Sequence, residues 1–148
     1  MLIEPRVLSV SRAPRLLVGE DDPEMRALLG ASLRADGFEV IEMKDGEEVL
    51  VHLSEVSAHR AQRPDLVIMD VRMPRHSGLE LLAAMQLADW KVPVILITAF
   101  GDDRLHQQAK ELGAAAVFDK PFDLDDLRTA ILNLCPAALS MPPRSSSS

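Results

Sequence analysis

The sequence predicts an α/β fold, a (βα)5 doubly wound parallel sheet, from three observations. Short apolar runs of strand length occur five times, and a stretch with helical periodicity follows each of them. Glycine, proline and aspartate stand at the junctions, where they end strands and begin helices. The 148 residues suffice for one domain, and 47% apolar and 26% charged residues are typical of a globular protein.

Strands are expected at 15–19, 38–42, 66–69, 94–97 and 115–118. The run at 38–42 alternates apolar and polar residues, which indicates a strand at the edge of the sheet. The other runs are mainly apolar, the pattern of strands buried on both faces. Right-handed crossovers between parallel strands would then place helices on both sides of the sheet.

Helices are expected at 23–36, 45–59, 79–88, 103–112 and 124–134. Asp22, Asp45 and Asp123 are suited to cap the N-termini of the first, second and fifth helices. Gly37 and Gly113 are suited to end the first and fourth, because glycine adopts the left-handed conformation found there. The chain is therefore expected to alternate strand and helix throughout.

The domain is expected over residues 14–135, after an N-terminal extension of residues 1–13. Residues 136–148 are rich in proline and serine, which predicts a disordered tail or the stub of a linker. No apolar run reaches the roughly 18 residues of a membrane span and the start lacks the order of a signal peptide, so we expect a cytoplasmic protein without membrane contact. The net charge of −7 argues against direct nucleic acid binding by this domain.

Polar residues end four of the predicted strands, at Glu20-Asp21, Asp70, Thr98 and Lys120. The carboxyl ends of parallel strands meet at one edge, where α/β sheets bind ligands. Each residue alone could be an ordinary surface residue, but their joint placement predicts a site. Two carboxylates about 4 Å apart repel by roughly 4 kcal/mol at an effective dielectric of 20, so a cation is expected. Oxygen ligands alone favour a hard ion such as Mg²⁺.

Phosphoryl transfer is the chemistry that suits this set of groups. Mg²⁺ keeps several waters that a phosphate can displace. The hydroxyl of Thr98 and the ammonium of Lys120 could bind phosphoryl oxygens while unprotonated Asp70 attacks phosphorus. The product would be an aspartyl phosphate.

Four motifs in this order resemble the receiver domain of two-component response regulators, over about residues 14–134. They are VGEDDPEMR, IMDVRMPRHSG, ILITAFGD and FDKPF. The resemblance implies a flavodoxin-like strand order of 2-1-3-4-5 and Mg²⁺ as cofactor. It also implies a histidine kinase or a histidine phosphotransfer protein as phosphate donor. Either a downstream protein partner or a missing output domain would receive the signal.

By this resemblance Asp70 is the phosphoacceptor, which assists its own phosphorylation and dephosphorylation and is not an enzyme in the usual sense. The implied metal ligands are Asp70, Asp21, Glu20 acting mainly through water, and the backbone carbonyl of Arg72. The implied phosphoryl-binding residues are Thr98, Ala99 and Lys120, and Lys120-Pro121 would be a cis bond.

Val117 stands where the family usually has tyrosine or phenylalanine, three residues before the lysine. Strand alternation is expected to point Val117 outward and Phe118 into the core, so that the familiar aromatic switch is missing. The output face is still expected on the fourth helix, fifth strand and fifth helix. We expect a backbone-led change in residues 99–102 instead, with Gly101 as hinge and Phe100 changing its exposure.

Three alternatives remain beside a stand-alone phosphorylated switch. A phosphatase with an aspartate nucleophile would place a second aspartate at the position of Arg72, which argues against it. A pseudo-receiver that only binds proteins would not need the intact set of site residues. The chain could also be the receiver fragment of a longer DNA-binding regulator, and the sequence leaves that choice open.

Overall fold

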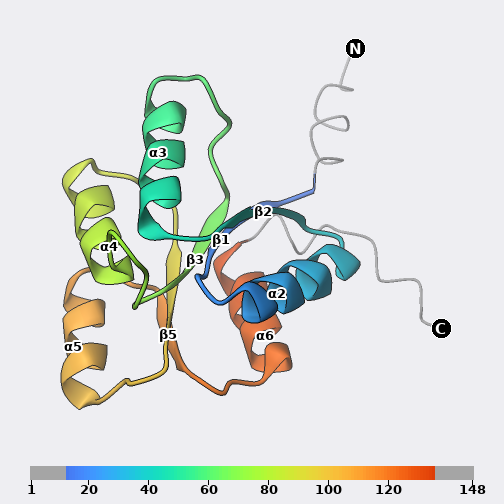
Figure 1. Cartoon of the computed structure of the whole chain (residues 1–148), viewed down its shortest axis with the longest axis vertical. Coiled ribbons are helices and arrows are strands. Elements are labelled where there is room, and N and C mark those ends of the chain that lie inside the picture. Colours follow the sequence, from blue (N-terminus) through green and yellow to red (C-terminus); the bar gives the residue numbers. More distant parts are fainter. Residues whose placement is uncertain (1–12, 136–148) are drawn as a thin grey trace, which may run out of the picture.

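The structure is a computed structural model that describes residues 13–135. Its five parallel strands form one sheet in the order β2-β1-β3-β4-β5, so the predicted fold class and strand order are confirmed (Figure 1). The strands are β1 (Arg15–Gly19), β2 (Glu39–Met43), β3 (Leu66–Asp70), β4 (Val94–Thr98) and β5 (Ala116–Asp119). The helices of the described residues are α2 (Pro23–Ala35), α3 (Gly46–Ser57), α4 (Gly78–Leu87), α5 (Asp103–Glu111) and α6 (Leu124–Leu134).

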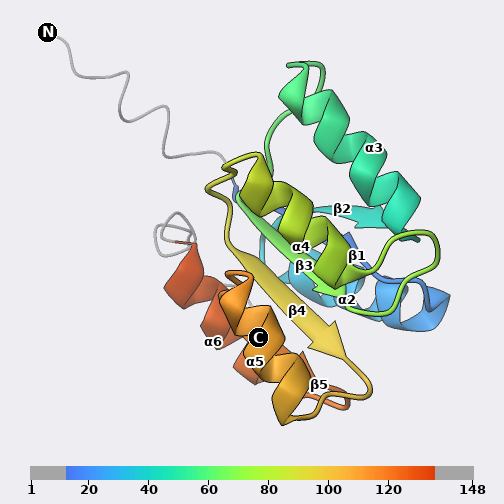
Figure 2. The same ribbon diagram turned by 90° about the vertical axis from the view of Figure 1, so that its left-hand side faces the viewer.

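Helices cover both faces of the sheet, with α2 and α6 on one side and α3, α4 and α5 on the other (Figures 1 and 2). The side chains of β1 alternate between these two layers. Leu16 packs in a cluster with Leu33 of α2 and Ile131 of α6, whereas Leu17 packs in a second cluster with Leu82 of α4. The members of both clusters are at most 8% exposed, so the polar strand ends follow directly from a tightly packed core.

The capping residues largely follow the sequence pattern. Asp22, Asp45 and Asp123 each accept a backbone hydrogen bond as N-caps, as predicted. The structure adds Ser77, whose capping box with Glu80 starts α4 at Gly78, one residue earlier than expected. The glycines predicted to end α2 and α5, Gly37 and Gly113, have positive φ angles of 99° and 96°.

The position of Val117 corrects one prediction. Val117 was expected to point outward, but it is half-buried and packs against the layer of α3, α4 and α5. Phe118 packs on the opposite face, where its ring meets that of Phe122 edge to face at 6.0 Å. The prediction was wrong because both faces of a doubly wound sheet are covered by helices, so the outward face of β5 also meets a packed layer.

The predicted domain limits fall partly outside the described residues. Residues 1–12 of the expected extension and the expected tail at 136–148 lie outside the described residues. Among residues 13–135, none of the helices combines the length and the hydropathy of a membrane span.

Candidate functional site

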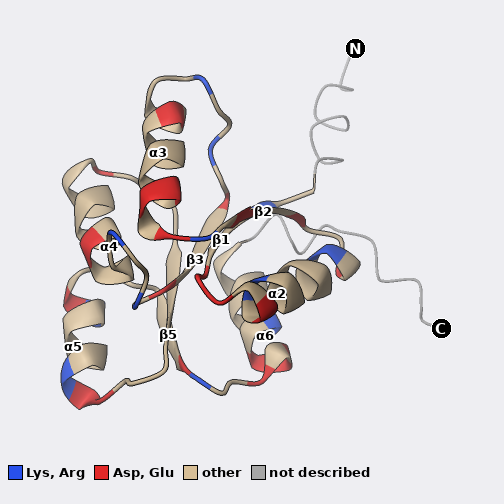
Figure 3. Ribbon diagram, viewed as in Figure 1, with Lys and Arg blue, Asp and Glu red and all other residues tan. Residues whose placement is uncertain are grey.

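The predicted site residues come together because the strands are parallel and in register. Asp70 of β3 pairs with Ile97 of β4, and Thr98 pairs with Asp119 at the end of β5. The Lys120 backbone N–H donates to the Thr98 carbonyl at 2.8 Å, which extends the pairing to the lysine. Figure 3 shows acidic residues where β1 joins α2 and at the end of β3. One edge of the sheet therefore collects groups from four strand ends.

Three carboxylates form a compact group at this edge. One carboxylate oxygen from each of Glu20, Asp21 and Asp70 lies within 4.8 Å of the other two. Asp70 and Glu20 are only 4% and 1% exposed, whereas Asp21 is exposed to solvent. Buried carboxylates at this separation require positive charge nearby.

Lys120 supplies positive charge from the protein itself. Its Nζ atom lies 2.5 Å from Asp70 Oδ2 and 3.1 Å from Glu20 Oε1. Burial lowers the pKa of Lys120, but the hydrogen bond to Asp70 and the negative charges of Asp70 and Glu20 outweigh this effect, so the pKa is raised overall. The ammonium therefore stays charged and bridges the two buried carboxylates.

The burial of Glu20 makes its carboxyl group hard to ionise in the absence of a metal. Desolvation by burial, with a smaller contribution from the charge of Asp70, raises its pKa to about 7. The Asp22 N–H, which donates to Oε2 at 3.0 Å, and Lys120 act in the opposite direction. The buried Oε1 atom lies at ion-pair distance from Lys120 but accepts no well-directed hydrogen bond. This oxygen retains the capacity to bind a cation.

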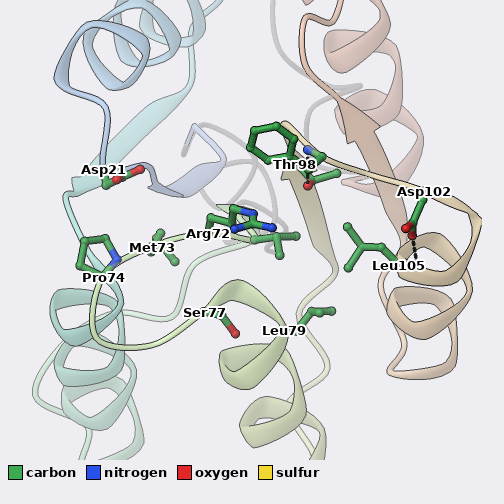
Figure 4. A pocket seen from close by; sticks show the side chains of 11 residues that line it. Asp21, Arg72, Met73, Pro74, Ser77, Leu79, Thr98, Asp102 and Leu105 are labelled. Carbon is green, nitrogen blue, oxygen red and sulfur yellow. Dashed lines mark hydrogen bonds between the residues drawn. The ribbon is translucent and has the colours of Figure 1, made fainter.

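The loop after β3 contributes a backbone hydrogen-bond donor to Asp70 and lines a hollow beside the site. The Arg72 N–H donates to Asp70 Oδ1 at 2.8 Å, so both oxygens of Asp70 are engaged. A hollow of about 660 Å³ opens beside the site, and Figure 4 shows Asp21, Arg72 and Thr98 among the side chains that line it. The metal-ligand role of the Arg72 carbonyl stays a prediction. The Lys120-Pro121 bond is cis, as expected.

The loop after β4 packs tightly on the site. Thr98 is 1% exposed, and its hydroxyl accepts a hydrogen bond from the Phe100 N–H at 3.2 Å. A Cβ atom on Gly101 would lie 2.1 Å from Asp119 Oδ1 and 2.8 Å from Thr98 Cγ2, so only glycine fits. The Phe100 side chain is 71% exposed, with the Arg72 guanidinium 5.0 Å from the centre of its ring.

Two contacts of this site were not predicted from the sequence. One is the pairing of Arg72 with Phe100, for which the sequence carries no signal because it depends on the folding of two loops. The other is Arg26 of α2, which donates to the Glu20 carbonyl. Its place one turn after the Asp22 cap is a weak signal that the sequence does carry.

A parallel sheet of this order, with acidic groups, a threonine and a lysine at its carboxyl edge, is the arrangement expected of a receiver domain. Residues 16–132 match the family model of the response regulator receiver domain. The chain belongs to this family.

Individual relatives agree with this assignment. Sporulation initiation phosphotransferase F of Bacillus subtilis is 33% identical over 122 residues, which are 82% of this chain and 94% of that protein. The transcriptional regulatory protein PdtaR of Mycobacterium tuberculosis is 40% identical over 119 residues, 79% of this chain. The chain spans 54% of that relative's length.

Solved structures show the same fold. The response regulator protein TrrA of Thermotoga maritima, solved in complex with Mg²⁺-BeF, has a TM-score of 0.70 and 30% identity, covering 82% of this chain and 98% of that one. A Francisella response regulator receiver domain has a TM-score of 0.76 with 23% identity, over 83% of this chain and 97% of that one. The second likeness concerns the fold alone.

Proposed function

We propose that this chain is a phosphoryl-accepting switch, in which Asp70 takes a phosphoryl group from a histidine kinase or a histidine phosphotransfer protein in a Mg²⁺-dependent reaction. The observation that carries the proposal is the setting of Asp70. Asp70 is 4% exposed, and its Oδ2 atom lies 2.5 Å from Lys120 Nζ. One oxygen of Asp70 also lies within 4.8 Å of an oxygen of each of the other two carboxylates, Glu20 and Asp21. A buried carboxylate that lies beside a lysine and a cation site is suited to attack phosphorus.

Glu20, Asp21 and Asp70 would hold the Mg²⁺, with the Arg72 carbonyl as a further ligand. The donor set consists of oxygens alone, and the buried Oε1 of Glu20 has no well-directed donor, so these residues fit a hard cation. When bound, the ion neutralises charge on the phosphoryl oxygens and on the carboxylates. Its presence in the complex of the Thermotoga relative supports the assignment.

The side chains of this chain would perform the transfer by orientation and charge. An Asp70 oxygen forms the new O–P bond as the N–P bond of the donor phosphohistidine breaks, and the imidazole nitrogen leaves with the electron pair. Lys120 and Thr98, with the backbone N–H of Ala99, would bind the phosphoryl oxygens. Hydrolysis later restores Asp70, so the chain assists its own phosphorylation and dephosphorylation.

The output would change partner binding through the surface of α5, β5 and α6. Thr98 would turn toward the new phosphoryl oxygens, which leaves space that half-buried Val117 is too small and too stiff to fill. The tight packing of Gly101 on Thr98 supports a backbone-led change of residues 99–102 in its place. The solvent-exposed fraction of the Phe100 side chain, which is exposed in this structure, would then change, and with it the surface that a partner contacts.

We also propose residues 14–135 as the functional domain, acting on a protein partner. A receiver fragment of a longer DNA-binding regulator is the second candidate, because the chain spans 54% of the regulator PdtaR. A reading frame that continues beyond Ser148 into a DNA-binding domain would establish the second candidate.

Labelling with acetyl phosphate and Mg²⁺ tests the phosphoacceptor. We expect one phosphoryl group per chain by mass spectrometry, and none in Asp70→Asn, because an amide is not nucleophilic. Asp89→Asn changes an exposed aspartate after α4 and should label like the unmodified chain. Undiminished labelling of Asp70→Asn would refute the assignment. Continuous release of phosphate without a stably labelled chain would favour the phosphatase, and the absence of both label and phosphate release would favour the pseudo-receiver.

A further inference from the structure

Arg26 reaches from the first turns of α2 back to the loop that carries two of the acidic residues. Its Nη1 atom donates to the Glu20 carbonyl at 2.9 Å and lies 3.5 Å from the Asp21 carbonyl. The Arg26 side chain is only 21% exposed, so the guanidinium is held within the fold. It contacts the backbone of both residues and leaves their carboxylates free to face Asp70.

Glu42 of β2 lies at ion-pair distance from the Arg26 guanidinium. Glu42 Oε1 lies 4.0 Å from Arg26 Nε, and Glu42 Oε2 lies 2.7 Å from Arg34 Nη1. The Glu42 carboxylate therefore interacts with both arginines. The two arginines are eight residues apart on one face of α2, and Gly30 lies midway between them. A Cβ atom on Gly30 would lie 2.2 Å from Glu42 Oε2, so glycine leaves the space that the carboxylate occupies.

We propose that Arg26 is a positioning residue for the cation site. Its guanidinium, which contacts both carbonyls, fixes the backbone of Glu20 and Asp21 so that their carboxylates converge with Asp70 before a cation binds. Groups that orient metal ligands typically change metal affinity 10- to 100-fold when they are removed. This inference rests on the proposed Mg²⁺ site and concerns how that site is held in shape.

Charge and positioning make opposite predictions for Arg26, which allows a decisive test. A positive charge close to the site repels Mg²⁺, so its removal alone would tighten Mg²⁺ binding. Loss of positioning would weaken binding, because the loop must then be ordered when the cation binds. The sign of the change in affinity therefore separates the two roles.

The test is calorimetric titration of the full chain with Mg²⁺. We expect Arg26→Ala to weaken Mg²⁺ binding about tenfold. Arg26→Lys should recover part of the loss, because an ammonium can still donate to one carbonyl. Arg34→Ala is the matched control: Arg34 also binds Glu42, but its hydrogen bonds go to Glu42 and the Val40 carbonyl, away from the loop. Arg34→Ala should stay within twofold of the unmodified chain.

Equal or tighter Mg²⁺ binding by Arg26→Ala would overturn the inference, as would an equal loss in Arg34→Ala. If Arg26→Ala does not fold, Arg26→Lys decides, and affinity equal to that of the unmodified chain overturns the inference.

Hydrogen exchange in EDTA gives a second readout without metal. The Glu20 N–H donates to the Met43 carbonyl and the Asp22 N–H donates to Glu20 Oε2, so both amides are protected. Arg26→Ala should speed their exchange and Arg34→Ala should not, and unchanged exchange in Arg26→Ala overturns the inference. A chain that binds no Mg²⁺ at all would refute the proposed function, and this exchange would still decide the role of Arg26.

Discussion

Glu20 should make the metal-free protein less stable as the pH rises. Burial raises its pKa from 4.5 to about 7 in the folded chain, whereas the unfolded chain ionises near the ordinary value. Between pH 4.5 and 7 the folded state therefore binds more protons than the unfolded state. The free energy of unfolding falls as the pH rises through this window, and the contribution of Glu20 is constant above it.

The size of the change in unfolding free energy follows from the pKa shift of Glu20. A difference of about 2.5 pKa units corresponds to about 3 kcal/mol, at 1.36 kcal/mol per unit. The carboxyl is 1% exposed, so solvent screens this cost little. Glu20→Gln keeps an oxygen that can accept from the Asp22 N–H but cannot ionise. The variant should gain stability relative to the unmodified chain as the pH increases.

Urea denaturation in EDTA at pH 5, 6, 7 and 8 measures the change. We expect the difference in unfolding free energy between Glu20→Gln and the unmodified chain to move by about 2.5 kcal/mol in favour of the variant from pH 5 to 8, because part of the full shift lies below pH 5. Glu24→Gln, which removes an exposed carboxylate near the start of α2, corrects for the change in net charge. A difference that does not vary with pH would refute the argument that burial of Glu20 costs stability.

Two further predictions concern the cation and the output. Asp21→Ala should abolish Mg²⁺ binding and Mg²⁺-dependent labelling. The fold should persist, because the Asp21 side chain is exposed to solvent. Calorimetry measures Mg²⁺ binding and circular dichroism measures the fold, and unaltered Mg²⁺ affinity would contradict the prediction. Beryllofluoride with Mg²⁺ should shift NMR signals throughout residues 99–112, including Gly101, and shifts confined to the strand ends would contradict the backbone-led change.

The sequence predicted which polar residues would lie together because the fold brings the ends of parallel strands to one edge. Glu20, Asp70 and Lys120 are far apart in the chain, yet each follows an apolar run, and parallel pairing alone brings them to one edge. Local capping signals were equally informative for three helices, whereas the Ser77 capping box was not predicted although the sequence carries its Ser-x-x-Glu pattern. What these signals share is that they need only backbone geometry.

Features that depend on side-chain direction were harder to predict. Val117 was misplaced because alternation along a strand tells which residues share a face but not what covers that face. The contacts of Arg26 depend on a long side chain turning back toward the loop before its own helix. Helical periodicity places the Cα of such a residue but does not determine its rotamer.

The ion pairs of Lys120 have a consequence for ion selectivity. The ammonium, held between Asp70 and Glu20, is a tethered competitor for any cation that approaches these carboxylates. Because it belongs to the same chain, its effective concentration is far above that of a free monovalent salt ion. K⁺ or Na⁺ would offer no more charge than the ammonium already supplies, whereas a divalent ion doubles it. Lys120 would thus discriminate against monovalent salt by charge, independently of ionic radius.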